Sequence, residues 1–164
     1  MAGTVFEQET GLSVHKAWDE IIAKPLGMED YRPERQFYVN RYSDTRHLAY
    51  YFRVTARDLA RFGQLFLNRG TWNGKQIIPG WWVDESTRKR SQVNNFGPDL
   101  NGFGYMWWQD TDGGYSARGY GGHAVKVIPE EDLVIVFRVD TDQGYFFNTG
   151  TMKTLTSRIV NARK

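Results

Sequence analysis

The feature that most constrains the fold is a set of three short apolar segments near the carboxyl end, separated by connections of turn composition. These segments are predicted strands, and they span residues 103–108, 122–128 and 133–139. The connection at 110–114 reads Asp-Thr-Asp-Gly-Gly, and the one at 129–132 reads Pro-Glu-Glu-Asp. Because connections this short join antiparallel neighbours, the sequence predicts a three-stranded antiparallel meander.

Helical patterns lie on both sides of the meander. Helices are predicted at 2–9, 14–23, 55–69, 79–86 and 151–162. Ser13 is placed to cap the second helix, and Thr55 and Asp58 have the spacing of a capping box at the third. The element order predicts an α+β fold and a single domain over 1–164, with a mainly helical region at 1–101 followed by strands and a last helix at 102–164.

Composition agrees with a globular domain and argues against several classes of protein. The 164 residues are 40% apolar and 24% charged, with a net charge of +2. The chain has no cysteine, which excludes thiolate metal sites and cysteine nucleophiles. No apolar run is long enough to span a membrane, and Arg88–Arg90 is the only basic run, so neither a membrane nor a nucleic-acid partner is predicted.

Aromatic residues are unusually frequent, at 15% of the chain, and they are compatible with either a heavy core or an aromatic-lined cleft. No cofactor or metal site is predicted. The three histidines lack metal-ligand spacing, and the glycine-rich run at 119–124 is followed by a predicted strand where a dinucleotide site needs a helix.

Ser13-Val14-His15-Lys16 matches the Ser-x-x-Lys pattern, in which a lysine one helical turn away accepts the proton of a nucleophilic serine. Ser13 is equally suited to capping the helix. Lys16 lies on the polar side with Glu20 and Lys24, whereas a catalytic lysine needs partial burial to lower its pKa. The pattern therefore favours a cap over a nucleophile.

Four runs, taken in order, resemble serine hydrolases of the β-lactamase and penicillin-binding-protein type. They are Thr10-Gly11 leading to Pro25-Leu26-Gly27-Met28, the stretch 55–79, the stretch 103–108, and 115–123 followed by Pro129 and an apolar strand. The runs cover nearly the whole chain, and the fourth is closest to 6-aminohexanoate-dimer hydrolases and related esterases. The chain is thus identified as the C-terminal part of such a hydrolase.

The resemblance implies a site on the strand that follows residue 115. In this family Ser-x-x-Lys and Tyr-x-Asn motifs precede the region that begins at Met1, so the chain is expected to lack the nucleophile. The third motif, Lys-Thr-Gly or His-x-Gly, corresponds to Ala117-Arg118-Gly119. The alanine disfavours recognition of a substrate carboxylate. The resemblance also implies that the backbone N–H of Tyr120 is one of two oxyanion-hole donors.

The predicted substrate-binding residues are Ala117, Arg118 and Gly119, together with Tyr105 and Trp107. Tyr105 and Trp107 are included because their strand is expected to pair across the 110–114 turn, beside the third motif. No catalytic side chain is predicted, since the expected contribution of Tyr120 comes from its backbone.

The resemblance also has a consequence for assembly. The family builds a five-stranded sheet from an N-terminal pair and a C-terminal trio, and only the trio is predicted here. The exposed edge predicts self-association or a complementary N-terminal segment. Two functions stay open: part of a serine hydrolase acting on amide or ester bonds, or a non-catalytic binding module that keeps the cleft without the chemistry.

Overall fold

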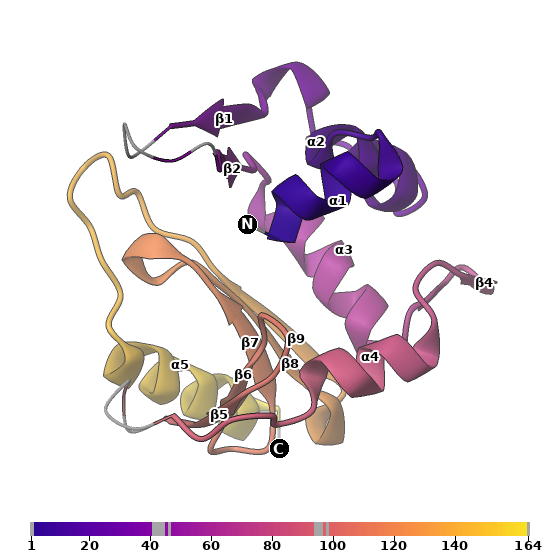
Figure 1. Ribbon diagram of the computed structural model, residues 1–164. Coiled ribbons are helices and arrows are strands. Elements are labelled where there is room, and N and C mark those ends of the chain that lie inside the picture. The colour runs from indigo at the N-terminus through magenta and orange to yellow at the C-terminus, as the bar shows by residue number, and fades with distance from the viewer. Residues whose placement is uncertain (1, 41–44, 46, 94–96, 98, 164) are drawn as a thin grey trace. The chain divides into compact units, whose positions relative to one another are not determined.

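The computed structural model describes residues 2–40, 45, 47–93, 97 and 99–163. The chain divides into two compact units, residues 1–58 and 59–164 (Figure 1). The boundary falls inside a helix, well before the change of hydrophobic pattern near residue 102.

The first unit is built from short helices and a small sheet. Its elements are α1 (Ala2–Thr10), α2 (Val14–Trp18), the π-helical turn η1 (Asp19–Ala23), the 3-10 turn η2 (Pro33–Arg35) and the antiparallel pair β1 (Phe37–Val39) and β2 (Ala49–Tyr51). The predicted cap is confirmed, because Ser13 Oγ accepts a hydrogen bond from the Lys16 N–H at 3.1 Å. The predicted helix 14–23 changes to π geometry at Asp19, where the Lys24 N–H donates to the Asp19 carbonyl, five residues back.

The second unit is dominated by one antiparallel sheet. Its strands run β5 (Leu100–Phe103), β6 (Trp108–Asp110), β7 (Tyr115–Arg118), β8 (Ala124–Ile128) and β9 (Leu133–Phe137), and their spatial order equals their chain order. The other elements are α3 (Ala56–Leu67), which begins in the first unit, the hairpin β3 (Thr71–Trp72) and β4 (Lys75–Gln76), α4 (Gly80–Thr87), the 3-10 turns η3 (Tyr120–Gly122) and η4 (Pro129–Glu131), and α5 (Thr149–Ala162).

The predicted α+β class is confirmed, whereas the predicted number of meander strands is wrong. The segment 103–108 is two strand ends joined by a turn, in which the Gly104 N–H donates to the Trp107 carbonyl at 2.7 Å and Met106 has a φ of 67°. β7 is a further strand that the apolar pattern did not predict, although the family resemblance placed a strand after residue 115. It lacks an apolar run because two of its four residues, Ser116 and Arg118, are polar.

The two faces of the sheet pack against different helices. One core cluster joins Phe66 of α3 and Val83 of α4 to Trp107, Tyr115 and Val127. On the opposite face, Met152 of α5 packs against sheet residues; these are Ala124, Ile128, Ile135 and Phe137. The sheet therefore lies between α5 on one side and α3 with α4 on the other (Figure 1).

The contact between α3 and the sheet depends on a glycine. A Cβ atom added at Gly63 would lie 2.5 Å from Cγ1 of Val134 and 2.9 Å from Cγ1 of Val125. The absence of a side chain lets the helix backbone approach β8 and β9 closely. Among the described residues, no helix is long and apolar enough to cross a membrane.

Candidate functional site

The end of β7 is followed by a tight turn rich in glycine. β7 pairs with β8 as far as Arg118, which lies opposite Ala124, and the Gly119 N–H then donates to the His123 carbonyl at 2.8 Å. Gly121 and Gly122 have φ values of 76° and 90°, a region that glycine adopts without steric cost. At Gly122 a Cβ atom would lie 2.4 Å from the carbonyl oxygen of Phe147, so space as well as conformation requires glycine.

The backbone N–H of Tyr120 lies beyond the sheet ladder. Gly119 and Gly122 both donate within the turn, but in the described part of the chain the Tyr120 N–H donates to no backbone carbonyl. Tyr120 is 75% exposed as a residue, and its ring meets the ring of the exposed Phe146 edge-on, with centroids 5.6 Å apart. The N–H is thus available to an external acceptor, as an oxyanion donor must be. Its catalytic role stays a prediction.

The Arg118 side chain takes part in a buried ionic network. Its Nε donates to Ser116 Oγ at 2.9 Å, and its Nη2 donates to Asp99 Oδ2 at 2.7 Å and to Asp110 Oδ1. Only 10% of the Arg118 side chain is exposed. Its Nε and Nη2 therefore bind the protein itself, whereas Nη1 is buried with no hydrogen-bond partner among the described residues. Any contact with substrate stays a prediction.

Lys126 extends this network across the sheet. Its Nζ lies 3.0 Å from Asp110 Oδ2 and 2.7 Å from Asp112 Oδ2, and the lysine side chain is 6% exposed. Burial raises the pKa of Asp110, and the neighbouring charges of Lys126 and Arg118 oppose that rise. Two cations thus meet three carboxylates on the face of the sheet that α5 covers.

The remaining predicted substrate-binding residues lie in different environments. Ala117 packs against the cluster that contains Trp107, a residue that is 5% exposed and whose ring centroid lies 4.5 Å from that of Phe66. Tyr105 is exposed and stacks on Trp82, with ring centroids 5.7 Å apart. None of the ring contacts of Tyr105 or Trp107 involves Tyr120. Gly119 adjoins Tyr120 in the chain, whereas among the described residues neither ring contacts Tyr120.

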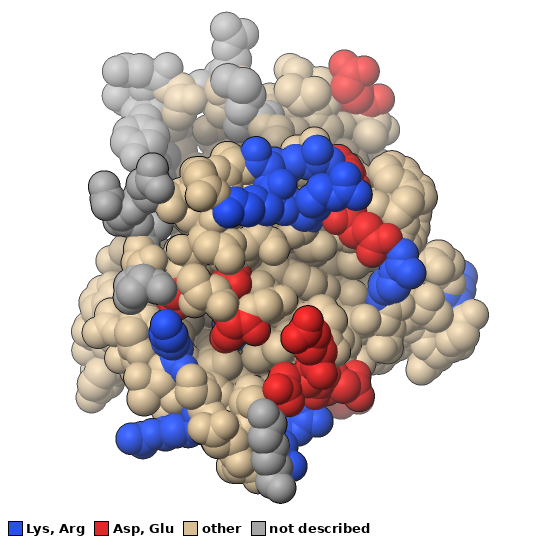
Figure 2. All heavy atoms as spheres, turned by 90° about the horizontal axis from the view of Figure 1, so that it is seen from below, with Lys and Arg blue, Asp and Glu red and all other residues tan. Residues whose placement is uncertain are grey.

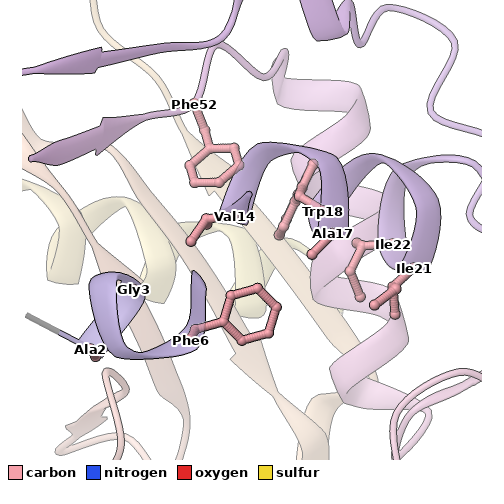
Figure 3. A pocket seen from close by; sticks show the side chains of 9 residues that line it. All are labelled: Ala2, Gly3, Phe6, Val14, Ala17, Trp18, Ile21, Ile22 and Phe52. Carbon is pink, nitrogen blue, oxygen red and sulfur yellow. The ribbon is translucent and has the colours of Figure 1, made fainter. Parts of the chain in front are cut away.

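In the first unit, the Ser13–Lys16 pair has the geometry of a helix cap. Lys16 Nζ lies 3.9 Å from Glu20 Oε1, and its side chain is exposed. A groove of about 410 Å³ lies nearby, between α1 and α2. Figure 3 shows the side chains of Phe6, Trp18 and Phe52 around it. The nine lining residues include no titratable group, so the groove offers apolar contact without acid–base chemistry.

Several surface charges form ion pairs. Arg88 Nη1 lies 3.8 Å from Glu85 Oε2, and Arg90 also pairs with Glu85. Figure 2 shows basic side chains gathered beside acidic ones on the face seen from below. Within the described ranges, no group of three or more histidine, aspartate or glutamate side chains is arranged to hold a metal ion.

The family model for beta-lactamase matches residues 1–150. The chain belongs to the beta-lactamase family. The predicted resemblance is thereby confirmed, and the turn after β7 lies within the matched range. A search of curated protein sequences found no match.

Several solved structures share the fold of the chain. A predicted 6-aminohexanoate-dimer hydrolase from Bacillus anthracis has a TM-score of 0.68 and 24% identity, over 98% of this chain and 41% of its own. A predicted beta-lactamase from Bacteroides dorei has a TM-score of 0.65 and 18% identity, over 98% and 55%. A penicillin-binding-protein homologue from Caulobacter crescentus has a TM-score of 0.62 and 16% identity, over 81% and 48%.

This member of the beta-lactamase family therefore spans about half the length of the structures it resembles. At these identities the likeness shows the fold. Sequence reasoning missed the ionic network around Asp110. Its one visible signal was Lys126, a charged residue at the centre of an otherwise apolar strand, Ala-Val-Lys-Val-Ile.

Proposed function

We propose that the chain is the C-terminal part of a serine hydrolase that acts on amide or ester bonds. In this proposal it supplies a wall of the substrate cleft and one oxyanion-hole donor, the N–H of Tyr120. The nucleophilic serine then comes from a Ser-x-x-Lys segment outside residues 1–164. The observation that carries the proposal is the position of Tyr120, whose N–H follows the end of β7 and has no acceptor in the described backbone.

The chemistry requires a donor that is fixed before the reaction starts. When a serine oxygen adds to the substrate carbonyl, the carbon–oxygen π electrons move to oxygen, which becomes an anion. An N–H already aimed at that oxygen stabilises the charge without reorganising. The hydrogen bonds that Gly119 and Gly122 donate on either side of Tyr120 support such a fixed direction.

The first test concerns the nucleophile. The chain alone, incubated with a fluorophosphonate or a penicillin probe, should show no covalent adduct by intact-mass spectrometry. The reason is that Ser13 Oγ caps a helix and Lys16 pairs with Glu20. An adduct that maps to Ser13 and disappears in Ser13→Ala would refute this part of the proposal.

The second test concerns the donor. We would mix the chain with the part of the Bacillus anthracis protein that it does not cover, check complex formation, and follow hydrolysis of a p-nitrophenyl ester. Turnover should need both components, and Tyr120→Pro should lower kcat by roughly 100-fold or more, because proline has no N–H. Gly119, with φ −125° and ψ 179°, already has a conformation allowed before proline.

Tyr120→Phe is the matched variant, since it removes the hydroxyl and keeps the N–H. It should lose far less activity than Tyr120→Pro. Equal losses would assign the effect to the phenol, and a complex without turnover would contradict the proposed hydrolase.

The second candidate is a binding module without chemistry. It is favoured by the exposed rings of Trp81, Tyr105 and Tyr120, which are available to a ligand whether or not a nucleophile is present. It predicts saturable quenching of tryptophan fluorescence by amide or ester ligands, with no turnover in the mixture.

A further inference from the structure

Arg118, a member of the buried ionic network, is the last residue of β7 and directly precedes the turn that carries Tyr120. We infer that Arg118 is a positioning residue, which holds the end of β7 and thereby fixes the direction of the Tyr120 N–H. The inference deepens the proposed function and rests on it. It also gives Arg118 a different task from the substrate contact predicted from the sequence.

The backbone of β7 is held unevenly. On one side it pairs with β8 along its whole length, from Tyr115 to Arg118. On the other side its register with β6 covers only Tyr115 and Ser116. Within the described residues, the last two positions of β7 therefore have a ladder partner on one side only.

The Arg118 side chain runs back along β7 and connects it to the segments on its β6 side. It contacts Asp110 at the end of β6 and Asp99 just before β5, in addition to Ser116 on its own strand. These contacts join three separate segments of the sheet. They are charge-assisted and almost fully shielded from water, so removal of Arg118 would leave buried carboxylates without their cation.

The turn after Arg118 needs such an anchor. Gly119, Gly121 and Gly122 give the backbone the conformations it requires, but glycine also leaves the unanchored chain the most freedom. At its far end the turn is held by the Phe147 N–H, which donates to the Gly121 carbonyl at 3.0 Å. Arg118 is the corresponding anchor at the near end. A donor is effective only when its supporting contacts hold it in place.

Lys126 provides a matched comparison within the same network. It is similarly buried and binds Asp110 and Asp112, but it lies at the centre of β8, with strand partners on both sides. Loss of its charge should weaken the sheet without freeing the turn specifically.

The experiment compares Arg118→Met and Lys126→Met in the full chain, using residue-resolved amide hydrogen exchange. In Arg118→Met the Gly119 and Gly122 amides should exchange roughly tenfold faster relative to the Val125 and Val127 amides of β8. In Lys126→Met the amides should change by a common factor. A uniform change in both variants, or equal loosening of the turn, would overturn the inference.

Arg118→Lys keeps the inference testable if Arg118→Met does not fold. Lysine retains the charge but cannot contact Ser116, Asp99 and Asp110 with a planar fork. It should keep more global protection than methionine and still loosen the turn selectively; unchanged turn protection would contradict the inference. The measurement needs no substrate, so selective loosening without turnover in the mixture would overturn the proposed hydrolase and leave the anchoring intact.

Discussion

Replacing Trp107 with alanine should destabilise the second unit strongly, because its indole ring lies in the core. The residue is 5% exposed, and the ring centroid lies 4.5 Å from that of Phe66 and 5.2 Å from that of Tyr115. Truncation removes these contacts and leaves a cavity beneath α3. For a buried tryptophan this costs about 3–5 kcal/mol of unfolding free energy. For a unit of this size the loss corresponds to roughly 10–20 °C in Tm.

The assay is thermal and urea unfolding followed by circular dichroism, with Trp81→Ala as the matched control. Trp81 is 66% exposed, and its truncation should change the unfolding free energy by about 0.5 kcal/mol or less. Equal, small effects of the two substitutions would refute the core position of Trp107. They would favour the cleft position that the sequence analysis predicted.

Gly63→Ala should lower the unfolding free energy of the second unit by about 1 kcal/mol despite the better helix propensity of alanine, because the methyl group would overlap Val134. A double-mutant cycle with Val134→Ala should show favourable coupling, and additive effects would contradict the close approach. Burial raises the pKa of Tyr31 to about 12, so the folded state retains a proton that the unfolded chain loses above pH 10. Stability should therefore fall as pH rises from 10 to 12, by up to about 1.4 kcal/mol per pH unit, and urea unfolding should show a shallower fall in Tyr31→Phe. β9 pairs only with β8 among the described strands, so light scattering at micromolar concentration should give a mass above that of one chain that decreases on dilution; a monomer throughout would contradict an open edge.

Local chemistry made much of the fold predictable. Ser13 caps α2 as expected, and the Asp58 N–H donates to Thr55 Oγ1 at 3.3 Å at the start of α3. Asn73 and Gly74 both have positive φ, as a two-residue hairpin turn requires. These features depend on residues that are close in sequence, so their signals survive without knowledge of the tertiary structure.

Non-local contacts explain what the sequence did not reveal. β7 is a strand because its polar residues find buried partners at Asp99 and Asp110, which are 19 and 8 residues from Arg118. Hydrophobic periodicity carries no signal for such a strand. The turn inside 103–108 was missed for another reason. It is closed by the backbone carbonyl of Trp107, and a backbone group leaves no signal in the side-chain pattern.

The sequence alignment of the third motif with residues 117–119 placed the side chains of Ala117 and Arg118 and the backbone N–H of Tyr120 in one site. In the structure these three groups point in different directions. Ala117 packs toward the core cluster beneath α3, and Arg118 points to the opposite face, into the ionic network. The N–H of Tyr120 belongs to neither face, because the strand has ended. Substitutions at 117 should therefore act through packing and those at 118 through anchoring, and only the loss of the N–H at 120 removes the donor itself. The residue type at position 117 or 118 therefore does not indicate a catalytic or binding role until the direction of its side chain is known.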